Sequence, residues 1–120
     1  MTNINEKTHH QLNSKMTLSE FEDILNSRPA FMLYFYNDIC GVCKTLLPKV
    51  KSLTETEFPE ILFIQLNTDT NRELAGQLRM LSVPGIILFM DGKEIFRSNG
   101  MISMDEFKAQ IARPYQIMFD

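Results

Sequence analysis

The chain has 120 residues, of which 44% are hydrophobic and 22% charged, and this composition is typical of one globular domain rather than of a disordered chain. Its net charge of −3 and the scattered placement of lysine and arginine argue against nucleic acid as a partner. No apolar run approaches the ~18 residues that a membrane-spanning helix needs, and the polar start of the chain lacks the apolar stretch of a signal peptide. We therefore expect a cytoplasmic protein with no membrane partner, in a compartment where structural disulfides are rare.

The first part of the chain divides into an arm and a helix. Residues 1–14 show no periodicity, and we expect a flexible arm ahead of a single domain over residues 15–120. Thr17 and Glu20 match a capping box, in which each side chain bonds the backbone N–H of the other residue. This pattern predicts a helix that begins after Thr17 and runs to about Asn26.

Two buried strands and a long helix are expected next. The apolar and aromatic run over residues 31–36 predicts a strand buried on both faces. After a short polar loop, a helix is expected from about Cys40 to Thr56, with Pro48 as a kink inside it. Residues 61–66 predict the second strand. Two strands bridged by a helix in this way are expected to be parallel, with a right-handed crossover.

Two further capping boxes predict the remaining helices. The first, Thr70 to Glu73, opens a helix expected to run to about Leu81. The second, Ser103 to Glu106, opens the last helix, and we expect Arg113-Pro114 to end it because proline cannot continue a helix. The apolar residues after that proline are expected to pack back on the rest of the domain, with a partner site as the alternative.

A hairpin completes the predicted sheet. Residues 85–90 and 94–98 predict two antiparallel strands, and Asp91-Gly92 between them is the signal for a two-residue type I′ turn. From residue 31 onward the elements run β-α-β-α-β-β-α. The sequence therefore predicts the α/β class, with a central mixed β-sheet flanked by helices.

The two cysteines lie where a buried strand leads into a helix, the place where reactive groups gather in open α/β sheets. Free backbone N–H groups and the helix dipole favour negative charge there, so the thiol of Cys40 is expected to ionise readily. Cys43 lies one turn further on the same face, within reach of Cys40. Gly41 keeps the approach to Cys40 open. This pattern predicts an exposed nucleophile with a resolving thiol behind it.

Two other interpretations of the cysteines remain. They could be half of a zinc site, with His9 and His10 as the remaining ligands, or they could be inert buried residues. Nothing in the sequence holds the two histidines near the cysteines, since they lie in the arm. We therefore favour the redox pair, and we expect no metal and no cofactor other than a redox-active disulfide between Cys40 and Cys43.

The segment around the cysteines resembles the active-site segment of the thioredoxin family. It reads Phe35-Tyr36-Asn37-Asp38-Ile39-Cys40-Gly41-Val42-Cys43-Lys44. Pro48 stands where the helix of that family carries its kinking proline, and Val83-Pro84-Gly85 resembles its cis-proline segment. The resemblance runs from about Thr17 to Ile111, nearly the whole chain.

This resemblance implies the thioredoxin fold and a thiol–disulfide oxidoreductase that reduces disulfides in protein substrates. Cys40 would attack, Cys43 would resolve the mixed disulfide, and an external reductase or thiol electron donor would restore the dithiol. The alternative is a thioredoxin-like module with a dedicated partner or a redox-sensing role and little general turnover. The residues that would dock the substrate are Ile39, Gly41, Val42, Val83, Pro84, Gly85, Gly100 and Met101, with Pro84 cis and the Val83 backbone pairing with a partner peptide.

The chain also departs from the family's pattern. Ile39 replaces the tryptophan that commonly precedes the first cysteine, and Val42 replaces a common proline. Tyr34 corresponds to the family's buried acid, and Gln65 corresponds to the lysine that usually partners it. Because that pair helps to move the proton off the resolving thiol, its replacement bears on turnover rate and redox poise.

Overall fold

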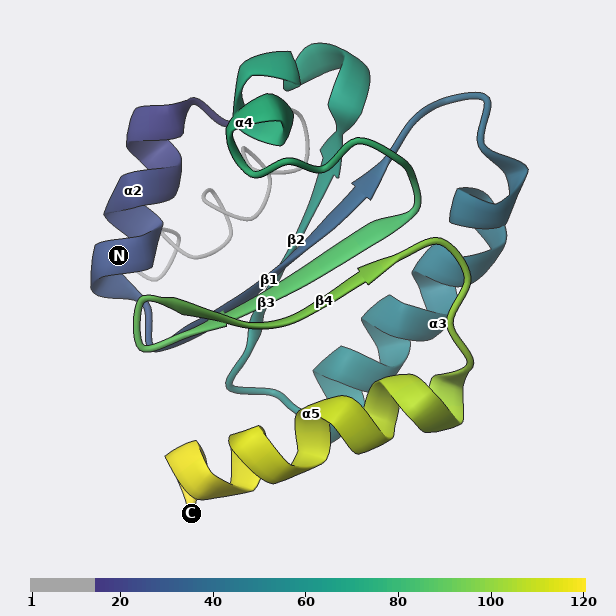
Figure 1. Cartoon of the computed structure of the whole chain (residues 1–120). Helices are drawn as coiled ribbons and strands as arrows, with labels where there is room; N and C mark the ends of the chain where they lie inside the picture. The colour runs from purple at the N-terminus through teal and green to yellow at the C-terminus, as the bar shows by residue number, and fades with distance from the viewer. Residues whose placement is uncertain (1–14) are drawn as a thin grey trace.

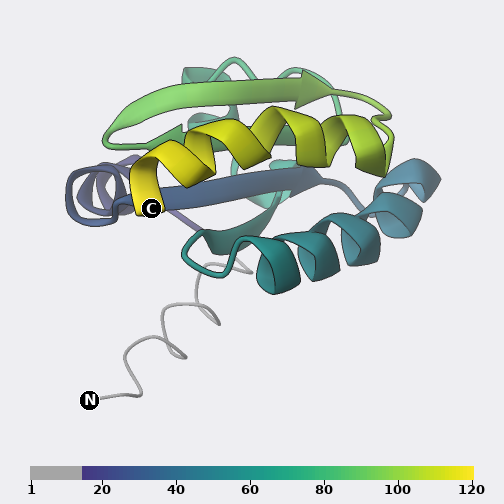
Figure 2. The ribbon, with the colours of Figure 1, turned by 90° about the horizontal axis from the view of Figure 1, so that it is seen from below.

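The computed structural model describes residues 15–120, and the arm expected over residues 1–14 lies outside this range. In chain order the elements are α2 (Leu18–Ser27), β1 (Ala30–Tyr36), α3 (Gly41–Glu57), β2 (Leu62–Asn67), the 3-10 helix η1 (Thr68–Thr70), α4 (Arg72–Gln77), β3 (Gly85–Met90), β4 (Lys93–Asn99) and α5 (Met104–Phe119). The four strands form one sheet in the order β2-β1-β3-β4. Helices α2 and α4 cover one face, and α3 and α5 cover the other (Figure 1, Figure 2).

The sheet is mixed, as the sequence predicts. Strand β1 pairs with β2 in parallel and with β3 antiparallel, and β4 pairs antiparallel with β3. The turn between β3 and β4 has positive φ at both central residues, 53° at Asp91 and 75° at Gly92, which is the geometry of the predicted type I′ turn. The predicted α/β fold with a central mixed sheet flanked by helices is confirmed.

Strand β1 connects the two hydrophobic cores of the structure. Its side chains alternate between the faces of the sheet, so Met32 and Tyr34 belong to the core under α3 and α5, while Leu33 and Phe35 belong to the core under α2 and α4. All four of these side chains are fully buried. This explains why the strand is apolar throughout instead of alternating with polar residues.

Helix α2 begins as predicted. The Glu20 N–H donates to Thr17 Oγ1 (3.1 Å), and the Thr17 N–H donates to Glu20 Oε1 (2.8 Å), which completes the capping box. Met16 and Phe21, on either side of the cap, are both buried and pack in the same core. Local sequence and tertiary packing therefore agree on where this helix starts.

The helix predicted to open with Thr70 and Glu73 and to run to Leu81 is wrong at both ends. Residues 68–70 form the 3-10 helix η1, and Asn71 holds the N-cap position of α4. Asn67 Oδ1 accepts the N–H of Asp69 (2.8 Å), and this tight turn places Thr70 ahead of the helix instead of at its cap. At the other end, Arg79 adopts a left-handed φ of 57°, which stops α4 after Gln77.

The prediction that Arg113-Pro114 ends the last helix is also wrong, because α5 continues through Pro114 to Phe119. Tyr115 explains the continuation. Its ring packs edge-on against Phe58 (ring centroids 5.0 Å apart) and lies 4.9 Å from the ring of Phe119, while its hydroxyl accepts the N–H of Glu60 (3.1 Å). A proline inside a helix costs about 3 kcal/mol, and burying aromatic side chains offsets a cost of that size.

None of the helices in residues 15–120 is both long enough and apolar enough to cross a membrane.

Candidate active site

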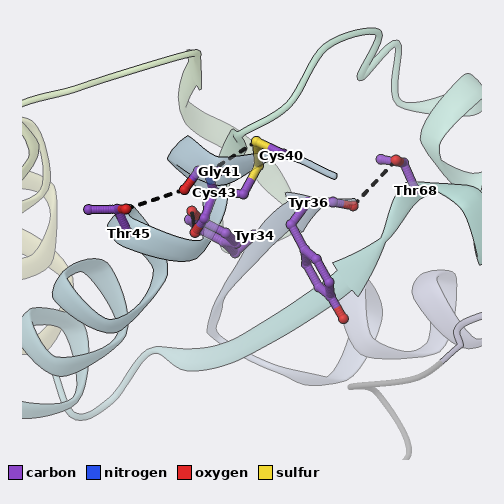
Figure 3. Close-up of a disulfide and its surroundings, with 7 residues drawn as sticks. All are labelled: Tyr34, Tyr36, Cys40, Gly41, Cys43, Thr45 and Thr68. Carbon is purple, nitrogen blue, oxygen red and sulfur yellow. Dashed lines mark hydrogen bonds between the residues drawn. A yellow bond between two sulfur atoms is a disulfide. The ribbon is translucent and has the colours of Figure 1, made fainter. Parts of the chain in front are cut away.

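Cys40 and Cys43 form a disulfide at the start of α3, directly after the loop that leaves β1 (Figure 3). Their Cα atoms are 5.3 Å apart. Cys40 holds the N-cap position of α3, and its sulfur accepts the N–H of Cys43 (3.1 Å). An N–H aimed at a sulfur from a helix N-terminus stabilises the thiolate that forms on reduction.

The two cysteines differ in how exposed they are. Cys43 is 1% exposed and points into the structure, whereas Cys40 is half-buried at the surface. A Cβ built on Gly41 would meet no atom within 4 Å, so the space beside Cys40 is open. An external disulfide can therefore reach Cys40 more readily than Cys43.

The loop before Cys40 is tied to the end of β2. Asn67 Nδ2 donates to Asp38 Oδ1 (3.1 Å), and Thr68 Oγ1 donates to the carbonyl oxygen of Tyr36 (3.3 Å; Figure 3). Because β1 and β2 are parallel neighbours, their ends lie together, and both bonds cross between them. These contacts fix the approach of the chain to Cys40.

Tyr34 lies beneath the disulfide. It is fully buried in β1, and its hydroxyl donates to the carbonyl oxygen of Cys43 (2.9 Å; Figure 3). Burial raises the pKa of Tyr34 to about 12, because the low-polarity surroundings disfavour the charged phenolate. Tyr34 is opposite Gln65 in the sheet register. The sequence singled out both positions, but the bond to Cys43 depends on the fold and was not foreseen.

The segment around Pro84 lies at the same end of the sheet as the two cysteines. Gly85 pairs with Phe35 near the end of β1 and with Asn99 at the end of β4. The Val83–Pro84 peptide bond is cis, and the carbonyl oxygen of Pro84 accepts the N–H of Gly100 (2.7 Å). Gly100 has a φ of 92°, a conformation that requires glycine.

The predicted docking residues differ in how exposed they are to solvent. Pro84 and Gly85 are buried, Val83 and Gly100 are half-buried, and the rest are exposed. Gly85 faces inward, where any added Cβ would collide with the Sδ and Cε atoms of buried Met80. Ile39 is 92% exposed and Met101 70% exposed.

Leu81 is an exposed apolar residue that the sequence analysis missed. It is 88% exposed and lies two residues before Val83. The helix predicted from the sequence runs to this position, which makes the residue a helix end. The signal that could have found it is a large apolar side chain in the short connection before Val83-Pro84.

Within residues 15–120, no three His, Cys, Asp or Glu side chains are grouped so that they could hold a metal ion. His9 and His10, the candidate zinc ligands, lie outside the described residues.

Comparisons with known proteins agree with this geometry. A family model described as Thioredoxin matches residues 13–113. Thioredoxin-like protein YdfQ of Bacillus subtilis is 26% identical over 101 residues, covering 84% of this chain and 89% of the relative. Thioredoxin of Chlamydia trachomatis is 33% identical over 82 residues, covering 68% of this chain and 79% of the relative. The structure of a mutant thioredoxin from Halobacterium salinarum has a TM-score of 0.71 at 28% identity, covering 82% of this chain and 85% of that one.

Proposed function

Because this chain belongs to the thioredoxin family, we propose that it reduces disulfide bonds in protein substrates by cycling Cys40 and Cys43 between dithiol and disulfide. Membership of the family indicates thiol–disulfide oxidoreductase chemistry in general. The observation that carries the specific proposal is the contrast between the two sulfurs. Cys40 is accessible at the start of α3 and accepts a backbone N–H, whereas Cys43 is buried behind it.

In the proposed cycle, the thiolate of Cys40 attacks one sulfur of the substrate disulfide. The substrate S–S bond breaks, a mixed disulfide with Cys40 forms, and the first substrate sulfur leaves as a thiolate that takes up a proton. Cys43 then loses its proton and attacks the sulfur of Cys40, which releases the second substrate thiol. Two electrons have passed to the substrate, and the resulting Cys40–Cys43 disulfide is reduced again by an external reductase or thiol.

The substrate would dock at the end of the sheet where β1 and β4 end and β3 begins. We propose that Ile39, Val42 and Met101 supply apolar contacts. The backbone of Val83 would pair with an extended substrate segment. Gly41 would leave Cys40 accessible, and the buried Pro84 and Gly85, with Gly100, would shape the main chain of the site. The cytoplasmic location expected from the sequence stays a prediction.

Single-cysteine variants test the division of labour. Cys43→Ser should accumulate stable mixed disulfides with protein substrates, because the resolving thiol is gone, and the matched control Cys40→Ser should accumulate none. In the reduced protein, Cys40 should also be alkylated much faster than Cys43 at neutral pH. Trapping through Cys43 instead of Cys40, or equal alkylation rates, would show that the roles are wrongly assigned.

Turnover separates the proposed function from its alternative. With dithiothreitol as the electron donor, the wild-type protein should reduce insulin, and both serine variants should be inactive. Reversible oxidation of the cysteine pair without turnover on insulin would instead favour a redox-sensing module or one with a dedicated partner. The buried Tyr34 hydroxyl in place of an acid is the feature that would favour that alternative.

A further inference from the structure

The connection between α4 and β3 leads directly into Val83-Pro84 and begins with a sharp reversal of the chain. Helix α4 ends at Gln77, and Arg79 is left-handed. The Met80 N–H returns to the carbonyl oxygen of Ala75 (2.8 Å). Helix ends leave carbonyl groups that no helical N–H can satisfy. The C-cap residue Leu78 carries one of them, and Arg79 just beyond the helix presents its own carbonyl beside it.

Arg97 on β4 bonds both of these carbonyls. Its Nη2 donates to the carbonyl oxygen of Leu78 (2.8 Å), and its Nη1 makes a longer bond to the carbonyl oxygen of Arg79 (3.4 Å). The register places Arg97 opposite Ile87, whose side chain lies in the core under α2 and α4. Arg97 therefore reaches across that face of the sheet to the end of α4.

Glu94 holds the guanidinium of Arg97 in place. The Nε and Nη2 atoms of Arg97 donate to the two carboxylate oxygens of Glu94, both at 2.9 Å. This bidentate arrangement fixes the orientation of the guanidinium plane. A glutamate carboxyl is already ionised at neutral pH, and the hydrogen bond from Arg97 lowers the pKa of Glu94 further.

The other end of the connection is also held by the end of β4. Gly100, three residues after Arg97, donates its N–H to the carbonyl oxygen of Pro84 (2.7 Å). Between the two attachments, Met80 is buried beneath Gly85, Leu81 is exposed, and Val83 is half-buried. Arg97 on β4 and Gly100 just after that strand thus hold the two ends of the segment that presents Leu81 and Val83.

We propose that Arg97 is a positioning residue for substrate docking: by bonding the Leu78 and Arg79 carbonyls, it holds residues 78–83 so that Val83 can pair with an extended substrate segment and Leu81 can contact its apolar side chains. This inference rests on the proposed function. A segment that is already ordered binds without the cost of ordering it. Loss of Arg97 therefore weakens binding of a protein substrate and leaves the sulfur chemistry unchanged.

Arg97 is suited to mutation because its side chain is 26% exposed on the edge strand. Arg97→Gln removes the fork and the charge. Lys93→Gln is the matched control, since Lys93 is exposed on the same strand and loses the same charge. We expect Arg97→Gln to raise KM for insulin about fivefold, the equivalent of about 1 kcal/mol, with kcat unchanged. Arg97→Lys, which can bond one carbonyl, should have a KM between those of wild type and Arg97→Gln.

A small disulfide provides the second arm. Reduction of 5,5′-dithiobis(2-nitrobenzoate) needs Cys40 but little docking surface, so Arg97→Gln should match wild type in this assay. Amide hydrogen exchange at Arg79 and Met80, whose N–H groups donate to the carbonyl oxygens of Gly76 and Ala75, should be several-fold faster in Arg97→Gln than in Lys93→Gln, whether or not the protein acts on insulin.

The possible failures are distinguishable. If wild type reduces insulin and Arg97→Gln behaves as Lys93→Gln does, or loses activity equally on both substrates, the positioning role is wrong and the proposed function stands. Unchanged amide exchange at Arg79 and Met80 would also overturn the positioning role. If wild type reduces the small disulfide but no protein disulfide, the proposed function is wrong, and the docking role of Arg97 falls with it.

Discussion

Tyr34 places a phenol beneath Cys43, at the position where the family commonly keeps a carboxylic acid. Burial raises its pKa to about 12, so the phenol stays protonated at neutral pH, and its O–H donates a hydrogen bond to the carbonyl oxygen of Cys43. Gln65, opposite on β2, does not ionise. This pair therefore offers no base to the thiol of Cys43, which must lose its proton before it can attack the mixed disulfide.

We expect resolution by Cys43, rather than the first attack by Cys40, to limit turnover, at a rate that rises with pH through the range in which Cys43 titrates. Tyr34→Asp should cost about 2–4 kcal/mol of stability, because it buries an ionisable group without a partner. It should nevertheless shorten the lifetime of the mixed disulfide near neutral pH, most clearly when combined with Gln65→Lys. Stopped-flow kinetics resolves the two steps.

Tyr34→Phe is the control, since it removes the hydroxyl without adding an acid. It should leave the lifetime of the mixed disulfide unchanged and cost about 1 kcal/mol for the lost hydrogen bond. The raised pKa of Tyr34 favours the folded state below pH 10 and ceases to do so as the pH climbs toward 12. Tyr34→Phe has no phenol to titrate, so it should lose less stability than wild type between pH 10 and pH 12. A folded Tyr34→Asp protein with an unaltered lifetime would mean that another group takes the proton.

Among the elements, α5 shows how packing can override a strong local signal. Pro114 removes one helical hydrogen bond, yet the helix continues for five more residues, to Phe119. Tyr115, in the first position after the proline, contacts both Phe58 and Phe119 and accepts a bond from the Glu60 N–H. We infer that this ring holds the last part of α5 in helical form.

Tyr115→Ala should therefore unwind α5 beyond Pro114 and cost about 2–3 kcal/mol. Circular dichroism would measure the lost helicity, and urea denaturation the lost stability. Tyr115→Phe keeps the ring and should cost no more than about 1 kcal/mol. Ile117→Ala, at a residue that is 73% exposed on the same turn, is the matched control and should have little effect. Equal losses in the two alanine variants would contradict the role of the Tyr115 ring.

The accuracy of the sequence-based prediction depends on how local each element's determinants are. The capping box at Thr17 and the Asp91-Gly92 turn require only neighbouring residues, and both formed as predicted. The capping box predicted at Thr70 and Glu73 failed because the Asn67 side chain draws residues 68–70 into a tighter turn. The prediction of where α5 ends failed because Phe58, which supports Tyr115, is distant in the sequence.

At the scale of the whole molecule, two apolar cores on opposite faces of one sheet hold the structure together. The Cys40–Cys43 disulfide encloses only four residues, so it restricts the unfolded chain little; the loop-entropy relation gives about 2 kcal/mol as its upper contribution. The sheet and its helices should therefore persist in the dithiol form. This is what a protein that cycles between the two redox states requires.

Reduction should accordingly leave the fold intact and lower the free energy of unfolding by no more than about 2 kcal/mol. Parallel urea denaturation of the oxidised and dithiothreitol-reduced protein measures the difference. The Cys40→Ser/Cys43→Ser variant should match the reduced protein within about 1 kcal/mol. Loss of the near-ultraviolet circular dichroism spectrum on reduction would contradict this prediction.

The candidate site was only partly predictable, because its parts differ in how far apart they are in the sequence. The cysteine pair follows from three-residue spacing at a strand-to-helix junction. The Tyr34 hydroxyl bond to Cys43 requires the position of α3 over β1. The contact of Arg97 with Leu78 spans 19 residues and depends on where α4 stops, which was itself mispredicted. Long-range contacts to backbone carbonyls leave no pattern in the sequence.

The position of Tyr34 also affects how the protein can be observed. The chain contains no tryptophan and three tyrosines, so its near-ultraviolet absorption and intrinsic emission are dominated by tyrosine. One of the three lies directly beneath the disulfide and is bonded to the backbone of Cys43. We expect a change of redox state at the cysteines to alter the surroundings of that chromophore. Tyrosine absorption or emission should therefore report the oxidation state of the protein without a label, and Tyr34→Phe should remove the part of the signal that depends on Tyr34.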